Sequence, residues 1–357
     1  QEKVIPVSSC MDQRLSLTPP DAESELAEQQ SPPAEVWPVA NDSFEPYRRT
    51  EIHRLPEMTP YGFEPYYLAP PQQIKRKVLR HWLLLALTAV TTSLAGAIWF
   101  GLSIKAGMVY SLTVLTILAA HEMGHYIASR WYGVDATLPY FIPFLIPPIG
   151  PIPYIPQIGT FGAFIRIKSA IPSRKALFDI GIAGPLAGFV FAVPAAFIAH
   201  YFAQPAQPFS AEGGGIILQD PLLFKLFHVL LRLPEEVELN PVMLGAWVGA
   251  LMTALNLMPV GQLDGGHVTY SVFGRLGHKI IAITCYVSVI ALTGYSLLSG
   301  AGNWVLYALI LTFMLRSGHP PVIDEQEPIG FGRKLVAIIG LIVFILCFMT
   351  VPIRLVG

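Results

Sequence analysis

Charged side chains are scarce in this chain. Of its 357 residues, 13% are Asp, Glu, Lys or Arg, 53% are hydrophobic, and the mean hydropathy is +0.52. Because soluble domains carry about 25% charged residues, this composition excludes an ordinary soluble protein and indicates a membrane protein. The formal net charge of -1 gives no reason to expect a nucleic-acid partner.

Cysteine is also rare. The three cysteines, Cys10, Cys285 and Cys347, lie far apart, and the last two fall in apolar runs. Their spacing suggests neither a disulfide framework nor a cysteine-based zinc site. The first residues show no pattern of a signal peptide.

Residues 1–70 lack any periodic apolar segment and are instead rich in Pro, Glu, Ser and Gln. Such a composition does not bury a hydrophobic core, so we expect a disordered, Pro-rich tail. Lys75, Arg76 and Lys77 follow the tail, and the positive-inside rule places them and the tail on the cytoplasmic side. We expect a transmembrane domain over residues 71–357.

The rest of the chain contains seven apolar runs, of which the sixth is the shortest. They cover about residues 82–102, 107–128, 176–201, 241–260, 280–298, 304–315 and 335–351. A helix of about 20 apolar residues spans a bilayer. We therefore predict an all-α polytopic membrane protein with six to seven transmembrane helices. Residues 204–240 are expected to form an extracytoplasmic loop.

Residues 139–160 are apolar but rich in proline, which forbids a helix. Non-helical backbone near a membrane must be sheltered by protein or line a cavity. Residues 160–168 then alternate between apolar and more polar side chains, which is typical of a strand. We predict that residues 139–168 form a re-entrant or hairpin loop beside the active site. A plain surface connector is the alternative.

The second apolar run carries the sequence His121-Glu122-Met123-Gly124-His125 near its end. Residues four apart lie on one face of a helix, so His121 and His125 can bind one metal ion together. Glu122 lies about 100° away around the helix and can flank the ion without binding it. Two imidazoles and a carboxylate in this spacing are typical of zinc hydrolases. A chance match is the alternative, but ionisable residues are costly inside an apolar segment.

A catalytic zinc ion needs a third protein ligand. The second and fourth runs point in the same direction because one run lies between them, so their carboxyl ends meet on one side. Asp264 directly follows the fourth run, where Pro259 and the nearby glycines release the backbone from the helix. Asp179 and His267 are the competing candidates. Asp179 could instead orient a metal-binding imidazole from outside the ligand set.

The two motifs, His121-Glu122-Met123-Gly124-His125 and Asn256-Leu257-Met258-Pro259 followed by Leu263-Asp264-Gly265, resemble those of the site-2 protease family, peptidase family M50. The resemblance covers about residues 80–355. The Pro-rich tail and the number of runs are similar to the bacterial and plastid branch that lacks an obvious PDZ domain.

This resemblance implies an intramembrane zinc metalloendopeptidase that acts in regulated intramembrane proteolysis. It implies that His121, His125 and Asp264 bind one Zn²⁺ ion and that Glu122 is the general base and acid. It further implies that Asn256 orients the substrate or stabilises the oxyanion.

The implied partners are the lipid bilayer and a membrane protein that is cut within a transmembrane segment, near the cytoplasmic face. The 160–168 strand could offer its edge to an unwound substrate. The bacterial inner membrane is the expected location, with a plastid membrane as the alternative. The sequence indicates no oligomeric state.

Two other functions stay open. The first is a metal-binding membrane scaffold that holds clients without cutting them, although Glu122 would then have no task. The second is a transporter that uses the His and Asp residues as an ion site. The sequence shows no internal repeat, and the candidate ligands lie towards one face rather than at the membrane midplane, which argues against transport.

Overall fold

The computed structural model describes residues 78–145, 157–206, 215–234, 236–298, 304–319 and 322–356. All of them belong to the second of two units, Gln73–Gly357. The predicted tail, 1–70, and residues 146–156 of the Pro-rich segment lie outside the described residues.

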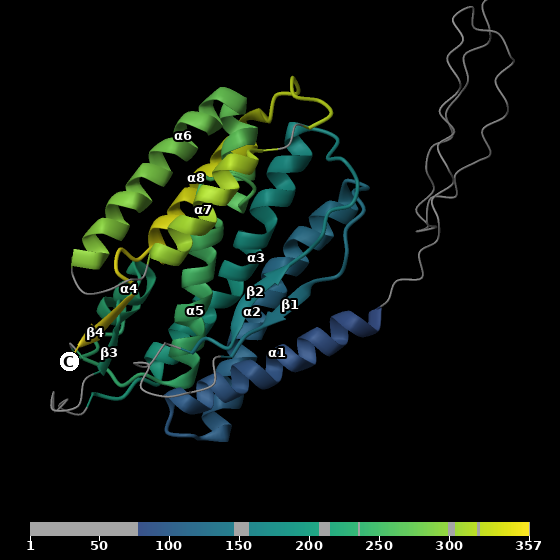
Figure 1. Ribbon diagram of the computed structural model, residues 1–357. Helices are drawn as coiled ribbons and strands as arrows, with labels where there is room; N and C mark the ends of the chain where they lie inside the picture. Colours follow the sequence, from purple (N-terminus) through teal and green to yellow (C-terminus); the bar gives the residue numbers. More distant parts are fainter. Residues whose placement is uncertain are drawn as a thin grey trace, which may run out of the picture. The chain divides into compact units, whose positions relative to one another are not determined.

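Helices dominate the described residues (Figure 1). They are α1 (Val78–Trp99), α2 (Ile104–Trp131), α3 (Arg174–Tyr201), α4 (Leu222–Leu230), α5 (Pro241–Asn256), α6 (Asp264–Leu298), α7 (Val305–Ser317) and α8 (Gly330–Cys347). Five of these, α1, α2, α3, α6 and α8, are long and apolar enough to cross a membrane, and α5 and α7 are shorter apolar helices. These seven helices correspond to the seven predicted runs, which confirms the helical membrane fold.

Polar residues that flank the apolar runs start several of the helices. The side chains of Ser103, Ser173 and Asn240 accept hydrogen bonds from the first backbone N–H groups of α2, α3 and α5. These caps satisfy donors that a helix cannot satisfy by itself. Pro241 occupies the first turn of α5, where proline costs no hydrogen bond.

The fourth predicted run is interrupted where the sequence analysis expected it to leave the helix. Helix α5 has 16 residues, which gives a length of about 24 Å, less than the hydrocarbon core of a bilayer. A turn over residues 257–263 follows, and α6 then begins at Asp264 itself. The prediction that the chain stays non-helical at Asp264 and the next glycines is wrong, because Gly265 and Gly266 lie inside α6.

Helix α6 is broken at Gly274, whose backbone is not helical (φ 70°, ψ -176°). A positive φ favours glycine, since it has no Cβ. The break divides α6 into a short part, 264–273, and a longer part, 275–298. The longer part contains the predicted span 280–298, whereas the shorter part was not predicted.

Two small antiparallel sheets accompany the helices. β1 (Tyr140–Pro143) pairs with β2 (Thr160–Phe164), which confirms a hairpin in the Pro-rich segment. β2 is shorter than predicted, but pairing resumes irregularly further on, where Ile167 forms a bridge with Ala136. β3 (Gly215–Leu218) pairs with β4 (Ile353–Val356), a long-range contact that the sequence did not predict.

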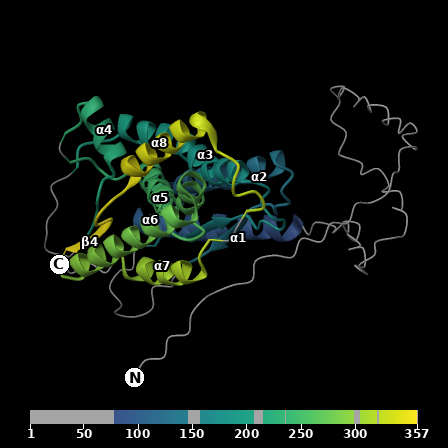
Figure 2. The ribbon, with the colours of Figure 1, turned by 90° about the horizontal axis from the view of Figure 1, so that it is seen from above.

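Helix α5 lies in the middle of the bundle. Seen from above, α3 and α8 lie on one side of it and α6 and α7 on the other (Figure 2). Its burial is correspondingly high, and Trp247, Val248 and Ala250 are almost fully enclosed. The residue at its carboxyl end, Asn256, therefore has a fixed position among the surrounding helices.

Small residues bring α2 and α3 together. A Cβ added to Gly124 would lie 2.5 Å from the carbonyl oxygen of Ala183, and one added to Gly184 would lie 2.0 Å from Nε2 of His125. No real side chain fits at either distance. The imidazole of His125 thus lies directly against the backbone of α3.

Candidate metal centre

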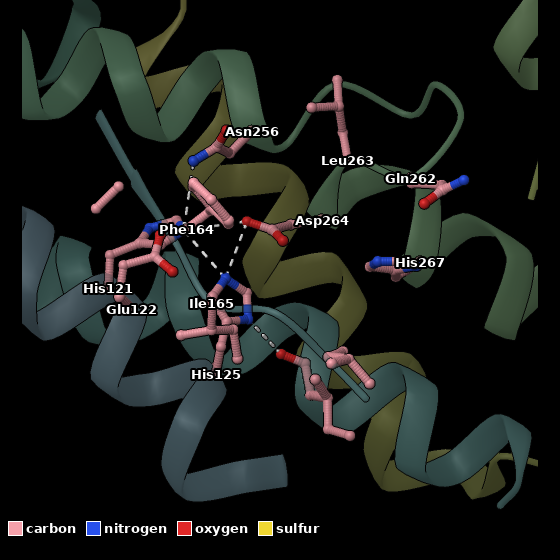
Figure 3. A pocket seen from close by; sticks show the side chains of 13 residues that line it. His121, Glu122, His125, Phe164, Ile165, Asn256, Gln262, Leu263, Asp264 and His267 are labelled. Carbon is pink, nitrogen blue, oxygen red and sulfur yellow. Dashed lines mark hydrogen bonds and ion pairs between the residues drawn. The ribbon is translucent and has the colours of Figure 1, made fainter. Parts of the chain in front are cut away.

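His121 and His125 lie one turn apart on α2, and both are buried. Their Nε2 atoms lie 3.1 Å apart. Oδ2 of Asp264, at the start of α6, lies 3.1 Å from Nε2 of His121 and 3.3 Å from Nε2 of His125. Figure 3 shows the three side chains converging from the two helices.

These distances fit the ligand set of one zinc ion. Ligands held at 2.0–2.1 Å around a tetrahedral ion lie about 3.3 Å from one another. The three donor atoms approach this triangle, and two imidazoles with one carboxylate suit zinc. Among the described residues, no other group of three such side chains comes within ligand distance. The structure thus brings together the three predicted ligands.

The tautomer of His125 also suits metal binding. Its Nδ1 lies 2.7 Å from the carbonyl oxygen of Ile180, which only accepts hydrogen bonds, so Nδ1 carries the proton. Nε2 then has a free lone pair directed towards His121 and Asp264. Carbonyl groups commonly fix metal-binding histidines in this way.

Glu122 lies beside the three donor atoms and is 4% exposed. Its carboxylate accepts a hydrogen bond from the backbone N–H of Ile165, which follows β2. Its Oε2 atom is buried and has no partner among the described residues. A buried carboxylate oxygen without a partner is costly, so this position fits a group that holds a water molecule next to a metal ion.

A cavity of about 200 Å³ joins these residues. Its walls come from α2, the end of β2 and the residues after it, α3, α5 and α6. The lining residues are His121, Glu122, His125, Ala163, Phe164, Ile165, Ile167, Ile180, Asn256, Gln262, Leu263, Asp264 and His267. The predicted loop therefore lies beside the centre, and its strand forms one wall.

Asn256 ends α5, and its Nδ2 atom lies 3.3 Å from Nε2 of His121. The amide is thus adjacent to the donor atoms, in the same cavity. This is where a group must lie if it contacts a substrate carbonyl bound at the centre. The position of Asn256 is thus compatible with its predicted role of orienting the substrate or stabilising the oxyanion.

Asp179 does not orient an imidazole, so that expectation is wrong. Its carboxylate accepts hydrogen bonds from Nε and Nη2 of Arg333, on α8, at 2.9 and 2.6 Å. Tyr132, just after α2, also donates to it. Successive side chains on a helix point about 100° apart, so Asp179 faces α8 while the next residue, Ile180, presents its carbonyl to His125.

This cluster of Tyr132, Asp179 and Arg333 connects α2, α3 and α8 next to the metal centre. Burial, together with the hydrogen bond to Asp179, raises the pKa of Tyr132, which keeps its hydroxyl a donor. A two-pronged Arg–carboxylate pair is geometrically specific. The cluster therefore fixes the rotation of the first turns of α3, and with it the carbonyl of Ile180.

His267 lines the cavity but lies outside the donor triangle. Its Nδ1 is 2.7 Å from Nε2 of His319, in the segment between α7 and α8. One of these nitrogens must donate to the other, so the pair satisfies itself. The sequence favoured Asp264 over His267 as the third ligand, and the structure places Asp264, not His267, beside the two imidazoles.

The model of peptidase family M50 matches residues 109–300, which is more than half of the chain. The chain belongs to peptidase family M50. The matched residues of this M50 protein include every side chain placed at the centre above, but not Arg333.

Relatives of this M50 protein occur in plants. It is 28% identical to "Probable zinc metalloprotease EGY2, chloroplastic" of Arabidopsis thaliana over 68% of this chain and 41% of that protein. It is 29% identical to "Probable zinc metalloprotease EGY1, chloroplastic" of the same species over 70% of this chain and 44% of that protein. The chain thus spans less than half the length of these relatives.

Among solved structures, the M50 protein matches "Site-2 Protease from Methanocaldococcus jannaschii". The two share 22% sequence identity, with a TM-score of 0.32, over 68% of this chain and 93% of the other.

The cluster of Tyr132, Asp179 and Arg333 should control zinc affinity. Replacing Arg333→Gln removes the ion-pair partner of Asp179 and leaves Tyr132 as its donor. The first turns of α3 should then shift and loosen the hydrogen bond between Ile180 and His125. We expect zinc affinity to fall roughly 10- to 100-fold, as for other groups that orient metal ligands. Competition with a zinc chelator, using the full chain in detergent, measures this.

Two further variants make this prediction specific. Lys175→Gln breaks an ion pair with Glu327, at 2.7 Å, which also joins the start of α3 to the segment before α8. Both partners are partly exposed, so zinc affinity should stay unchanged. Arg333→Lys keeps the charge but not the two-pronged geometry and should give an intermediate affinity. Equal zinc affinities for Arg333→Gln and Lys175→Gln would contradict the prediction.

Proposed function

We propose that this chain is an intramembrane zinc metalloendopeptidase that hydrolyses a peptide bond within a transmembrane segment of a membrane protein. The observation that carries the proposal is the triangle of His121, His125 and Asp264 with the unpaired oxygen of Glu122 beside it. This group lies inside a bundle of helices of membrane-spanning length. The names of the matched plant proteins, probable zinc metalloproteases, agree with it.

The centre contains the groups that hydrolysis requires. When bound, zinc would acidify a water molecule and polarise the substrate carbonyl. Glu122 accepts the proton of the attacking water, because its Oε2 atom has no partner among the described residues and its side chain lines the cavity. The same carboxyl group then returns this proton to the leaving amine.

Asn256 assists at the carbonyl. Its Nδ2 group, adjacent to His121, donates a hydrogen bond to the carbonyl oxygen as negative charge develops there. Because Asn256 is the last residue of α5, the helix holds its amide in position before the substrate reacts. Little movement of this side chain is then needed during the reaction. A role in orienting the bound substrate is the alternative that the same position allows.

A transmembrane substrate must unwind locally before it is cut, because a helix hides its carbonyl groups in hydrogen bonds. β2 offers a partner for the unwound segment. Its only partner among the described strands is β1, and its end and the following residues line the cavity. Strand addition at this edge would hold the peptide extended next to Glu122.

The orientation of the bundle follows from charge. The positive-inside rule favours a cytoplasmic position for the end of the bundle nearest the metal centre. The basic residues that support it lie before α1 and, as Arg166, Lys168, Arg174 and Lys175, before and at the start of α3. The bacterial inner membrane is the proposed location, with a plastid membrane as the alternative. A topology reporter fused before α1 would contradict this orientation if it faced away from the cytoplasm. One fused after α8 would contradict it if it faced the cytoplasm, because β4 follows α8 and pairs with β3 of the extracytoplasmic loop.

Glu122→Gln should separate catalysis from metal binding. Glutamine keeps the shape of the side chain but accepts no proton, so cleavage should fall by roughly 10²- to 10⁴-fold. Zinc content should stay at the wild-type level, because Glu122 is not a ligand. The assay uses a panel of tagged single-span proteins mixed with the full chain in detergent, with zinc measured on the same samples.

His125→Ala serves as the companion variant, since it should lose both zinc and activity. Undiminished cleavage by Glu122→Gln would exclude the proposed mechanism. A wild-type chain that binds zinc but cuts no member of the panel would favour the scaffold. Zinc flux into sealed vesicles without cleavage would favour the transporter.

Asn256→Ala should lower kcat with little change in KM or zinc content. Loss of one preplaced donor to a developing oxyanion costs roughly 10²- to 10³-fold in kcat. Gln262→Ala is the matched control, because this amide also lines the cavity but has no assigned contact with the donor atoms, and it should behave like the wild type. A rise in KM alone for Asn256→Ala would instead assign the residue to substrate orientation.

Strand addition predicts an alternating pattern of backbone contacts. Peptides copied from a cleaved region and methylated at single backbone nitrogens should compete with cleavage unequally. Methylation at every second residue should weaken competition, because only alternate N–H groups of an added strand face its partner. Equal competition by all the methylated peptides would argue against pairing with β2.

A further inference from the structure

A second cavity lies beside the turn of residues 257–263, which joins Asn256 at the end of α5 to Asp264 at the start of α6. It has a volume of about 450 Å³ and lies between α3, the α5–α6 turn, α6 and α8. Leu257 and Gly265 line it, and each is the direct neighbour of a residue of the metal centre, Asn256 or Asp264. The side chains of the metal centre do not line this second cavity.

The wall of this cavity is almost entirely apolar. Thr269 and Lys334 are the only polar side chains among the described residues that line it. The hydroxyl of Thr269 already donates to the carbonyl of Gly265 at 2.8 Å. Lys334 is exposed and forms no ion pair among the described residues. Its ammonium group is therefore available to a ligand.

The cavity opens towards the surroundings of the bundle. Phe273, Ile338 and Leu341 line it and are 60%, 54% and 56% exposed, respectively. Ile338 and Leu341 lie on α8, which is long and apolar enough to cross a membrane, so this opening is expected to face hydrocarbon. A ligand would therefore enter from the bilayer rather than from water.

The size of the cavity decides between two occupants from the bilayer. A transmembrane helix of about 20 residues has a volume of roughly 2,000 Å³, which is far too large. A cavity of a few hundred Å³ suits a small, flexible apolar ligand such as an acyl chain.

The charge at the mouth indicates the headgroup. Lys334 lies in the second turn of α8. Basic residues around a pocket between transmembrane helices favour acidic lipid headgroups.

We propose that this cavity binds an anionic phospholipid, with an acyl chain in the apolar part and the phosphate at Lys334. A lipid chain in the cavity would pack against Leu257 and Pro259 of the turn 257–263. It would thereby hold Asn256 and Asp264, at the two ends of this turn, in place. Lipid binding does not depend on catalysis, so it can be tested in the inactive Glu122→Gln chain.

The test measures which lipids the full-length Glu122→Gln chain retains. The protein is reconstituted in vesicles of equal parts phosphatidylglycerol and phosphatidylcholine and extracted in mild detergent, and the bound lipid is counted by mass spectrometry. We expect phosphatidylglycerol to be retained about fivefold over phosphatidylcholine. Adding Lys334→Gln should bring this ratio close to one, whereas Lys225→Gln, an exposed lysine on α4 outside the cavity, should leave it unchanged.

Filling the cavity tests the acyl-chain site. Ala337→Trp and, as a second variant, Val272→Phe should lower the amount of retained lipid. Zinc content, measured on the same samples, shows whether the metal centre of each variant is still folded. Soluble glycerol phosphate should not displace the lipid, because it has no acyl chain. Equal retention of the two lipids by the parent chain, or unchanged retention in both cavity variants, would overturn the proposal. Displacement by a single-span peptide would also overturn it and assign the cavity to substrate.

Discussion

The hydrogen bond between Nδ1 of His125 and the carbonyl of Ile180 is the contact on which the metal centre depends. It forms because α2 and α3 approach so closely that the imidazole lies against Gly184, where no side chain fits. This single contact sets the tautomer of His125 and the direction of its Nε2 atom. Asp264 and Glu122 can act at the metal centre only if this contact holds the His125 ring next to them.

Placing ionisable groups inside an apolar bundle is costly, and this chain offsets that cost by concentrating them. His121, His125 and Asp264 contact one another, and Asp179 is neutralised by Arg333. The interruption of the fourth span serves the same end. The turn of residues 257–263 brings the end of α5 and the start of α6 to one depth, so Asn256 and Asp264 reach the same cavity.

Much of the site could be predicted from the sequence, because its main signals are local or topological. The spacing of His121 and His125 fixes their common face, and the alternating direction of the spans brings Asp264 to them. The β1–β2 hairpin could be predicted because prolines exclude a helix over residues 139–160 and because apolar and polar side chains alternate over residues 160–168. These features depend only on helix geometry and on the requirement that apolar segments cross the membrane.

The remaining features depend on contacts that no local pattern encodes. The rotation of α3 decides that Ile180, rather than Asp179, faces His125, and it is set by Arg333, more than 150 residues away in the sequence. The short helical part that begins at Asp264, the pairing of His267 with His319 and the β3–β4 sheet are likewise long-range. Each requires knowledge of which surfaces meet, which hydropathy does not supply.

The β3–β4 sheet has a consequence for the order in which the protein assembles. Gln219, after β3, donates its backbone N–H to Pro352, and its carbonyl accepts from the indole of Trp247 in α5. Residues 353–356 leave the ribosome after α1 to α8, because they follow these helices in the sequence. The central helix of the bundle therefore gains this long-range support only after the segment that follows α8 has been translated, so α5 cannot be fully packed while the described helices are still being made.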